Sequence, residues 1–323
     1  MADNINNINE NEVTSEQPVQ TEASKKVMKE KNIDAVSKKQ TVMKVLVHIA
    51  LYGFLTIMAL IVLFPFYWML ISSVKTYDEY SLEVPTFWPN EFRWETYKLA
   101  FTGDLNLGRL FLNTLIVGVV STILSLIITV LSAYAFARLE FKGKNIMFAG
   151  LLATMMIPGE LFTITNFVTV SDLGWKNTYA VLIVPFLVSV FYIYLLRQNF
   201  LQIPNELYLA AKVDGTSDLK YLWKVMIPLA APTLISITIL KMMGSWNTYM
   251  WPRLVANDEA HKLITVGLRQ TNFWVSGYEG VEGMIDFPVQ MAAVVLVTIP
   301  LFLVFLFLRK YIMRGVSRSG IKG

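Results

Sequence analysis

Long apolar runs separated by short polar segments make up most of this chain. The first run, Val45 to Val74, carries no charge when His48 is neutral, and it exceeds the ~20 residues that a helix needs to cross a bilayer. Five further apolar runs follow, so the pattern predicts six membrane-spanning helices. They are expected over residues 45–74, 110–137, 146–168, 180–196, 226–249 and 287–308.

Composition agrees with a membrane protein. The chain has 323 residues, of which 54% are apolar and 16% charged, and its mean hydropathy is +0.49. A soluble domain would need more polar surface. The net charge of +4 is too modest to suggest nucleic acid as a partner, and the absence of Cys excludes disulfides. The sequence therefore predicts an all-α integral membrane fold.

The N-terminal region differs from the rest of the chain. Residues 1–40 are rich in Asn, Glu, Ser, Gln and Lys, without an apolar period long enough to build a packed element. They are predicted to form a disordered or loosely helical cytoplasmic tail, too long for the basic start of a cleaved signal peptide. Residues 41–323 form the expected transmembrane unit.

The basic residues predict the orientation of the spans. With the N-terminus inside the cell, 19 Lys and Arg lie on the cytoplasmic side and 8 on the other. Short loops rich in Lys and Arg stay in the cytoplasm. Both termini, and the polar segment between the fourth and fifth spans, are therefore expected to be cytoplasmic.

That polar segment has the signals of a helix, a tight turn and a second helix. Asn205 is a candidate N-cap for a helix over residues 206–213. Gly215 follows where a helix end favours the left-handed conformation. Thr216 or Ser217 is a candidate cap for the next short helix. Ala210 and Ala211 have small side chains, so the surface of another protein could approach the first helix closely, which suggests a docking element.

The same segment resembles the cytoplasmic coupling loop of ABC-transporter permeases, which would span residues 204–226 here. In that family, the loop reads Glu-Ala-Ala, three residues, Gly, about nine residues, then Ile-x-Leu-Pro. Leu209 occupies the position of the family's glutamate, and Glu206 lies one helical turn earlier. The residues that match are Ala210, Ala211, Asp214, Gly215, Val225, Ile227 and Pro228.

A wider resemblance covers about Val45 to Gly323. The segment AYAFARLEFKGKN, Ala133 to Asn145, together with Asn113 and Thr114, is similar to the smaller permease of maltose-type carbohydrate importers. This resemblance implies a type I importer fold with a core over residues 109–313 in a bacterial inner or plasma membrane. The implied partners are a second permease, two ATPase subunits, a periplasmic or extracellular sugar-binding protein and membrane lipid.

The resemblance implies a sugar permease without catalytic activity. The chain has no GxxxxGK[ST] phosphate loop, no His/Cys cluster with metal-ligand spacing and no legible Ser-His-Asp pattern. We therefore expect no bound cofactor and no metal, with ATP hydrolysed by partner subunits. Two alternatives stay open at this point: a permease for peptides or amino acids, and an ion-gradient transporter using Lys241 and Glu160 as a charged relay.

Four residues are candidates for the translocation path. Lys241 lies roughly 20 Å along a helix from Pro228, and a charge at that depth faces a cavity, pairs, or reaches the interface. Ser245 and Asn247 follow on neighbouring turns. Glu160, after a Pro-Gly break, is either a gate residue or an interfacial one.

Other positions have two interpretations each. Trp246 and Trp251 could stack on a sugar ring or anchor a span at the membrane interface. The outer loop over residues 251–286 is either a flexible connector or, by the resemblance, a contact for the binding protein. The basic tail, Arg309 to Gly323, is attracted to anionic lipid or, by the resemblance, contacts the ATPase pair.

Overall fold

A computed structural model describes residues 22–102, 106–270, 273 and 284–317. Every regular element in these ranges is a helix, which confirms the predicted all-α class. The helices are α1 Glu22–Ser72, α2 Tyr77–Tyr80, α3 Glu95–Thr102, α4 Leu107–Arg138, α5 Lys144–Thr154, η1 Gly159–Phe162, α6 Thr163–Asp172, α7 Tyr179–Ile183, η2 Val184–Phe186, α8 Val190–Leu201, α9 Asn205–Val213, α10 Asp218–Tyr221, η3 Leu222–Met226, α11 Ile227–Leu229, α12 Ala231–Asn247, α13 Met250–Val255, α14 Ile264–Gln270 and α15 Phe287–Ser317.

The chain forms two compact units, Met1–Phe66 and Tyr67–Gly323. In the first unit, α1 begins at Glu22, so residues 22–40 are helical, which is one of the two forms predicted for the tail. Glu, Ala, Lys and Met recur in this stretch and favour helix. Residues 1–21, the rest of that predicted tail, lie outside the described part.

Six regions of the described chain fit the predicted spans. Three helices are long and apolar enough to cross a membrane, over Met43–Ser72, Leu107–Arg138 and Phe287–Phe307. Up to six spans result if each of three bent helix pairs forms one. The pairs are Lys144–Thr154 with Gly159–Asp172, bent by 82°, Tyr179–Phe186 with Val190–Leu201, bent by 46°, and Asp218–Leu229 with Ala231–Asn247, bent by 81°.

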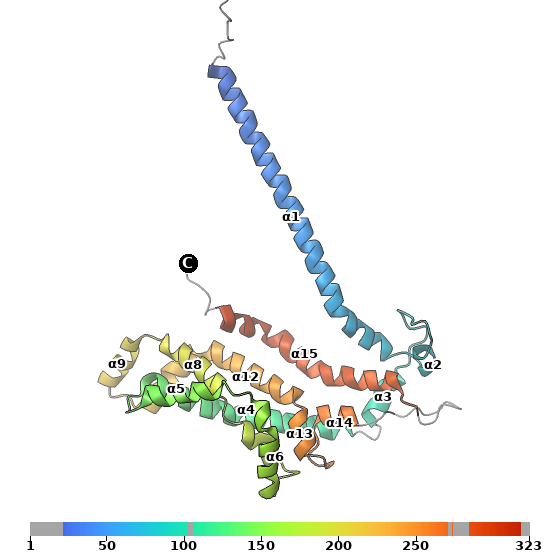
Figure 1. Cartoon of the computed structure of the whole chain (residues 1–323), viewed down its shortest axis with the longest axis vertical. Coiled ribbons are helices and arrows are strands. Elements are labelled where there is room, and N and C mark those ends of the chain that lie inside the picture. The colour runs from blue at the N-terminus through green and yellow to red at the C-terminus, as the bar shows by residue number, and fades with distance from the viewer. Residues whose placement is uncertain (1–21, 103–105, 271–272, 274–283, 318–323) are drawn as a thin grey trace, which may run out of the picture. The chain divides into compact units, whose positions relative to one another are not determined.

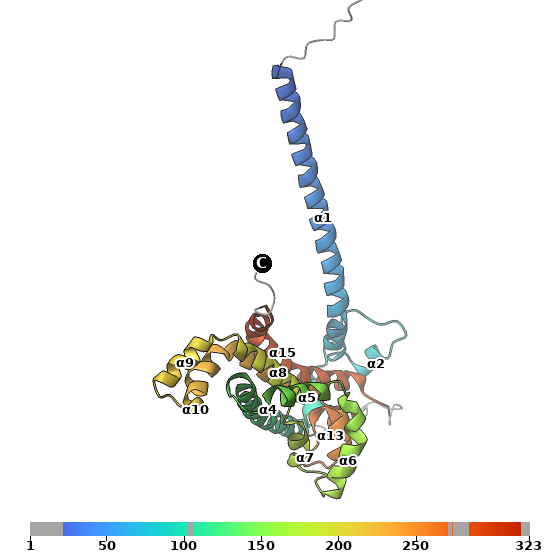
Figure 2. The same ribbon diagram turned by 60° about the vertical axis from the view of Figure 1, so that its left-hand side comes forward.

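Helix α4 is the centre of the second unit. It packs against α8 and α12, while α12 packs against α15. Gly118 allows α4 to approach α12, because a Cβ atom there would lie 3.0 Å from the Met242 sulfur. Figures 1 and 2 show α9 at one end of this helix bundle. We call the end that carries α9 and α10 the hairpin end.

Between α1 and α4, residues 73–102 fold into a segment with contacts to other parts of the second unit. Arg93 forms an ion pair of 3.0 Å with Asp286, just before α15. Thr96 donates a hydrogen bond of 2.6 Å to the Ser73 carbonyl. These contacts connect the segment to the last span and to the end of the first.

Candidate functional site

The hairpin of α9 and α10 has the turn that the sequence predicted. Gly215 adopts the left-handed conformation with φ of +66°. The Thr216 amide donates to the Ala211 carbonyl at 2.9 Å, and the Gly215 amide donates to the Lys212 carbonyl at 3.0 Å. This pair of bonds is the Schellman arrangement, which satisfies carbonyls at the end of a helix. The predicted left-handed conformation of Gly215 is confirmed.

The two predicted N-caps are only partly right. Ser217 is the N-cap residue of α10, although its side chain makes no capping bond. Asn205 is already helical, and Pro204 occupies the N-cap position of α9. The Asn205 amide oxygen instead accepts a hydrogen bond of 3.2 Å from Arg138. The prediction that Asn205 caps α9 is therefore wrong, because a guanidinium from another helix binds its side chain.

Asp218 joins three elements at the hairpin end. Its carboxylate accepts hydrogen bonds from Tyr134 of α4 at 3.1 Å and from Tyr208 of α9 at 3.0 Å. The Lys212 ammonium lies 3.0 Å from it as well. The hydrogen bond to Asp218 raises the pKa of Lys212, while burial, followed by the bond to Asp218, raises the pKa of Tyr208. Both groups therefore stay protonated at neutral pH.

Arg138 makes a second connection at the same end. It is buried at the last turn of α4 and donates to the carbonyls of Phe200, at 3.0 Å, and Ile203. These carbonyls lie at the C-terminal end of α8, where a cation is favourable. With its bond to Asn205, Arg138 links the end of α4 to both α8 and α9.

One face of α9 has no such contacts. Glu206, Leu209, Ala210 and Val213 are exposed, and their spacing places them on a single side of the helix. We call these four residues the outward face. Val213 is 89% exposed, so the face is largely apolar and open.

The other predicted coupling residues lie elsewhere. Ala211 is half-buried and packs against the core cluster beneath the hairpin, so it does not share a face with Ala210. Asp214 is the exposed C-cap of α9. Pro228 lies in α11, beside the 81° bend that leads into α12. The structure brings together Glu206 and Ala210 but not all six predicted residues.

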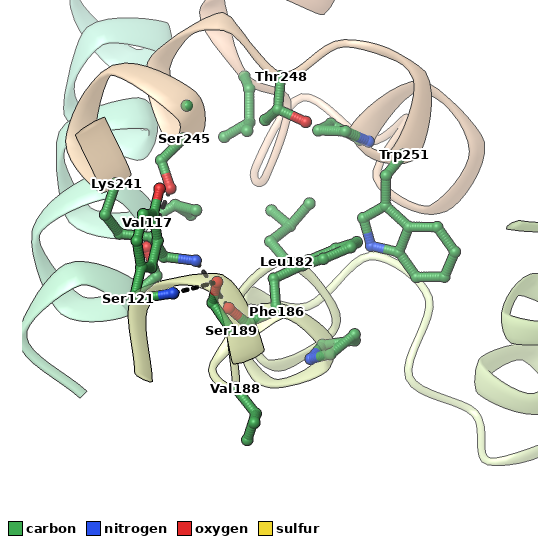
Figure 3. A pocket seen from close by; sticks show the side chains of 15 residues that line it. Val117, Ser121, Leu182, Phe186, Val188, Ser189, Lys241, Ser245, Thr248 and Trp251 are labelled. Atoms are coloured by element: carbon green, nitrogen blue, oxygen red, sulfur yellow. Dashed lines mark hydrogen bonds between the residues drawn. The ribbon is translucent and has the colours of Figure 1, made fainter. Parts of the chain in front are cut away.

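A cavity of about 380 Å³ lies between α4, η2, α12 and α13 (Figure 3). Ser121 and Ser245 line it and share a hydrogen bond of 3.0 Å. Lys241 also lines it, as does the aromatic ring of Trp251. The volume falls within the range of ligand pockets, and the lining combines hydroxyl groups, one cation and aromatic surface.

The cavity is placed at a break in the fourth candidate span. Pro185 in η2 has no amide hydrogen to donate, and the chain bends before α8 begins at Val190. At this bend the Phe186 carbonyl accepts a hydrogen bond of 2.7 Å from Lys241. Irregular backbone inside a membrane protein is tolerated where it lines a cavity.

Three other sequence candidates do not line this cavity. The Asn247 amide donates back to the Met243 carbonyl of its own helix at 3.0 Å. Glu160 is exposed on η1. Trp246 is buried and packs against Phe111, with ring centroids 5.8 Å apart. Places for Asn247 and Glu160 in the path remain predictions.

Two longer predicted segments fall partly outside the described residues. In the outer loop, residues 271–272 and 274–283 are not described, and neither are residues 318–323 of the basic tail. The interpretations of these segments stay predictions.

Sequence reasoning missed the residues that hold the hairpin to α4. Tyr134 and Arg138 lie four residues apart, so they share one face of that helix. Both are within the segment AYAFAR, whose spacing was the available signal. The polar partners far along the chain, Asp218 and Asn205, gave no indication of the pairing.

Comparisons with known proteins place this chain among transport proteins. Residues 125–318 match the family of binding-protein-dependent transport system inner membrane components. A solved bacterial ABC transporter involved in importing the acidic polysaccharide alginate has a similar chain, with a TM-score of 0.73 and 27% identity. The similarity covers 81% of this chain and 95% of that one.

Curated relatives extend the similarity over most of the length. The arabinooligosaccharides permease AraQ of Bacillus subtilis (strain 168) is 29% identical, covering 85% of this chain and 96% of the relative. The polygalacturonan/rhamnogalacturonan permease YtcP of the same strain is 31% identical over 84% and 97%. The trehalose/maltose permease MalG of Thermococcus litoralis is 32% identical over 83% and 94%. The chain therefore belongs to the binding-protein-dependent transport system inner membrane components, the multi-pass and non-catalytic part of ABC importers that work with an ATPase and a binding protein.

Proposed function

We propose that this chain is one of two different permease subunits of an ATP-driven saccharide importer. The relatives above carry the names of saccharide systems, both neutral and acidic. In this proposal, residues 41–323 form the permease unit, with 109–313 as its core. Two ATPase subunits and an external sugar-binding protein complete the complex.

The outward face of α9 is the observation that carries the coupling role. Its four side chains are exposed, whereas the opposite side of α9 is fixed to Asp218 through Tyr208 and Lys212. A short helix with one free apolar face and one fixed face suits insertion into a groove. The ATPase subunit is the proposed occupant of that face. At the usual glutamate position, Leu209 would make an apolar contact instead of a charged one.

Force would pass from the hairpin to the spans through two routes. One is the bend beside Pro228, which leads directly into α12. The other is α4, which the hairpin contacts through Tyr134 and Arg138. Coupling requires that both the ATPase and the solute bias the same two-state element. The hairpin is the proposed element, because it is connected to α4 and α12 and both of these helices line the cavity.

The hairpin end is proposed to face the cytoplasm, with both termini on that side. The excess of Lys and Arg on this side supports the orientation. The cavity is proposed to form part of the solute path, with Lys241 and Ser245 in its wall. Glu160 and Asn247 are proposed as residues of the solute path that lie outside the cavity. Their role there would depend on contacts with the second permease.

The experiment introduces a charge into the outward face. In a complex co-expressed with its ATPase, binding protein and second permease, Val213→Asp should lower ATPase co-purification at least tenfold. Tenfold corresponds to about 1.4 kcal/mol, which is modest for an unpaired carboxylate in an apolar interface. Saccharide-stimulated ATP hydrolysis in proteoliposomes should fall in parallel.

Lys98→Asp provides the control, because Lys98 is an exposed residue of α3 on the proposed outer side. This variant should retain the ATPase and its stimulation. Normal ATPase retention by Val213→Asp would contradict the docking role. Uptake of labelled peptides or amino acids, and of no saccharide, would contradict the proposed cargo.

A further inference from the structure

We propose that the cavity between α4, η2, α12 and α13 binds an acidic saccharide, with the Lys241 ammonium as the contact for its carboxylate. This inference rests on the proposed function and adds the charge class of the solute. It follows from the charges, donors and surfaces that the cavity wall presents.

The cavity wall has one basic side chain. Of its fifteen described lining residues, Lys241 is the only Lys, Arg or His, and none is Asp or Glu. An ammonium group within a membrane-embedded cavity is costly unless an anion accompanies it. The described wall supplies no carboxylate for this purpose. The solute is the proposed source of that negative charge.

The bond to Phe186 does not remove the need for an anion. A lysine ammonium has three N–H donors, and the Phe186 carbonyl accepts one of them at 2.7 Å. That carbonyl is neutral, so the full charge remains. The bond instead fixes the position of the ammonium at the wall, leaving two donors for a carboxylate oxygen. A positioned donor loses less entropy when the ligand binds.

A second source of positive potential lies next to Lys241. Helix α8 begins at Val190, and its N-cap residue Ser189 lines the cavity. The positive end of the dipole of this twelve-residue helix therefore borders the cavity. It supplements the charge of Lys241 and, like it, favours an anion over a neutral solute.

The remaining wall suits a sugar ring. Ser121, Ser245 and Thr248 present hydroxyl groups, which can donate to or accept from sugar hydroxyls. Trp251 and Phe186 present aromatic surface, with ring centroids 5.6 Å apart. The Trp251 ring nitrogen already donates to the Val181 carbonyl at 2.9 Å, so the ring is held in place. Figure 3 shows Lys241 and Trp251 on opposite sides of the opening.

The test compares matched acidic and neutral saccharides. The complete complex, with its binding protein, is placed in proteoliposomes and supplied with a labelled series of galacturonate oligomers. The same oligomers after reduction of their carboxyl groups provide a neutral series of equal size. The wild type should transport the acidic series preferentially. Lys241→Gln should lower that uptake at least tenfold, and Lys241→Arg should stay within about threefold of the wild type, because only Arg keeps the charge.

Two controls separate a path effect from other causes. Lys176→Gln removes an exposed lysine that does not line the cavity, and its uptake should equal that of the wild type. The binding protein is a separate chain and is the same in every sample, so differences between variants belong to the permease. As a direct measurement, acylation of Lys241 by an amine-reactive ester should be slowed by the acidic series alone.

The outcomes distinguish the two proposals. Preferred uptake of the neutral series, unchanged in Lys241→Gln, would overturn the acidic solute and leave the saccharide importer intact. Equal protection of Lys241 by both series, or by neither, would likewise overturn it. If the complex transports peptides and no saccharide, the proposed function itself fails. Uptake of the acidic oligomers that depends on Lys241 would establish both the saccharide importer and the acidic solute.

Discussion

Tyr134 of α4 and Asp218 of α10 are joined by a hydrogen bond of 3.1 Å from phenol to carboxylate, although 84 residues separate them along the chain. The same carboxylate binds Tyr208 and Lys212 of α9. A helix that reaches the cavity wall is thus connected to both helices of the hairpin. Any displacement of the hairpin must either move the end of α4 or break these bonds.

Removing the carboxylate should loosen the hairpin. In Asp218→Ala, the buried Tyr134 hydroxyl loses its acceptor, which costs about 1–3 kcal/mol. We expect amide hydrogen exchange over residues 205–213 to accelerate about tenfold or more, and solute transported per ATP to fall. Tyr134→Phe removes a donor without leaving a buried polar group, so its effect should be smaller.

Asp218→Asn is the matched control, since it keeps one oxygen for the tyrosines and loses only the charge. The pair with Lys212 is partly exposed, with side chains 43% and 38% accessible, and such pairs contribute little. The bond to Asp218 raises the pKa of Lys212, and the bond to Lys212 lowers the pKa of Asp218. The contribution of the pair is therefore present across neutral pH and is lost only as the pH falls through the lowered pKa of Asp218 or rises through the raised pKa of Lys212. A change between pH 6 and 9 in the hydrogen-exchange protection of residues 205–213 of the wild type would contradict this account of the pair.

Arg138 should matter more than Asp218. Arg138→Ala removes a donor from the Phe200 and Ile203 carbonyls and from the Asn205 side-chain oxygen. The Phe200 carbonyl keeps the Ile203 amide as a donor, so the buried Ile203 carbonyl loses the most, at about 1–3 kcal/mol. Arg138→Lys keeps the charge, but a single ammonium group cannot reach all three acceptors as the forked guanidinium does. We expect limited proteolysis within residues 202–218 to increase strongly in Arg138→Ala and less in Arg138→Lys. Lys142→Ala, at an exposed position nearby, should match the wild type.

The sequence was sufficient for the fold class because long apolar runs dictate helices that cross a bilayer. Bends were harder to predict. The 46° bend before α8 depends on Pro185, but proline also occurs within continuous α1 at Pro65. Whether a proline breaks a helix or stays inside it depends on which group bonds to the carbonyl four residues earlier, because the proline has no amide hydrogen for it. For Pro185 that carbonyl belongs to Val181, and its donor is the Trp251 ring nitrogen, 70 residues away, so the local pattern could not reveal it.

Helix ends were predicted where local chemistry decides them. Gly215 has the left-handed conformation that the local sequence predicts for a glycine after the end of α9. Asn205 failed as a cap because its partner, Arg138, comes from a helix 67 residues earlier. The hairpin's cohesion therefore depends on long-range side-chain contacts, whereas its turn depends on one local residue.

The effect of replacing Gly215 should depend on whether the new residue adopts the left-handed conformation, and not on the size of its side chain. No atom lies within 4 Å of a Cβ built there, yet φ is +66°. An L-residue in this conformation costs about 1–2 kcal/mol, and a β-branched residue is less suited still. Gly215→Val should reduce solute-stimulated ATP hydrolysis severely while the protein stays in the membrane.

Gly215→Asn is the comparison variant, because Asn adopts the left-handed conformation more readily. It should retain most of the stimulated hydrolysis. Equal stimulation of Gly215→Val and wild type would show that the geometry of this turn is not needed for coupling.

The ion pair of Arg93 and Asp286 should hold the segment between α1 and α4 onto α15. Asp286 is 2% exposed, and its other oxygen accepts from the Val289 amide in the first turn of α15. Removing one partner leaves the other charge buried, which costs about 3–5 kcal/mol. Arg93→Ala should therefore lower the melting temperature of the purified complex and expose residues 75–102 to protease.

A double-mutant cycle separates the pair from the packing around it. Arg93→Met with Asp286→Leu replaces both charges by apolar side chains, and it should recover much of the stability that either single variant loses, because no unpaired charge remains. Additive losses in the double variant would mean that the two side chains act independently. Since Asp286 precedes α15 and accepts from the Val289 amide in its first turn, the recovered stability measures the ion pair, and the remaining deficit measures the lost helix cap.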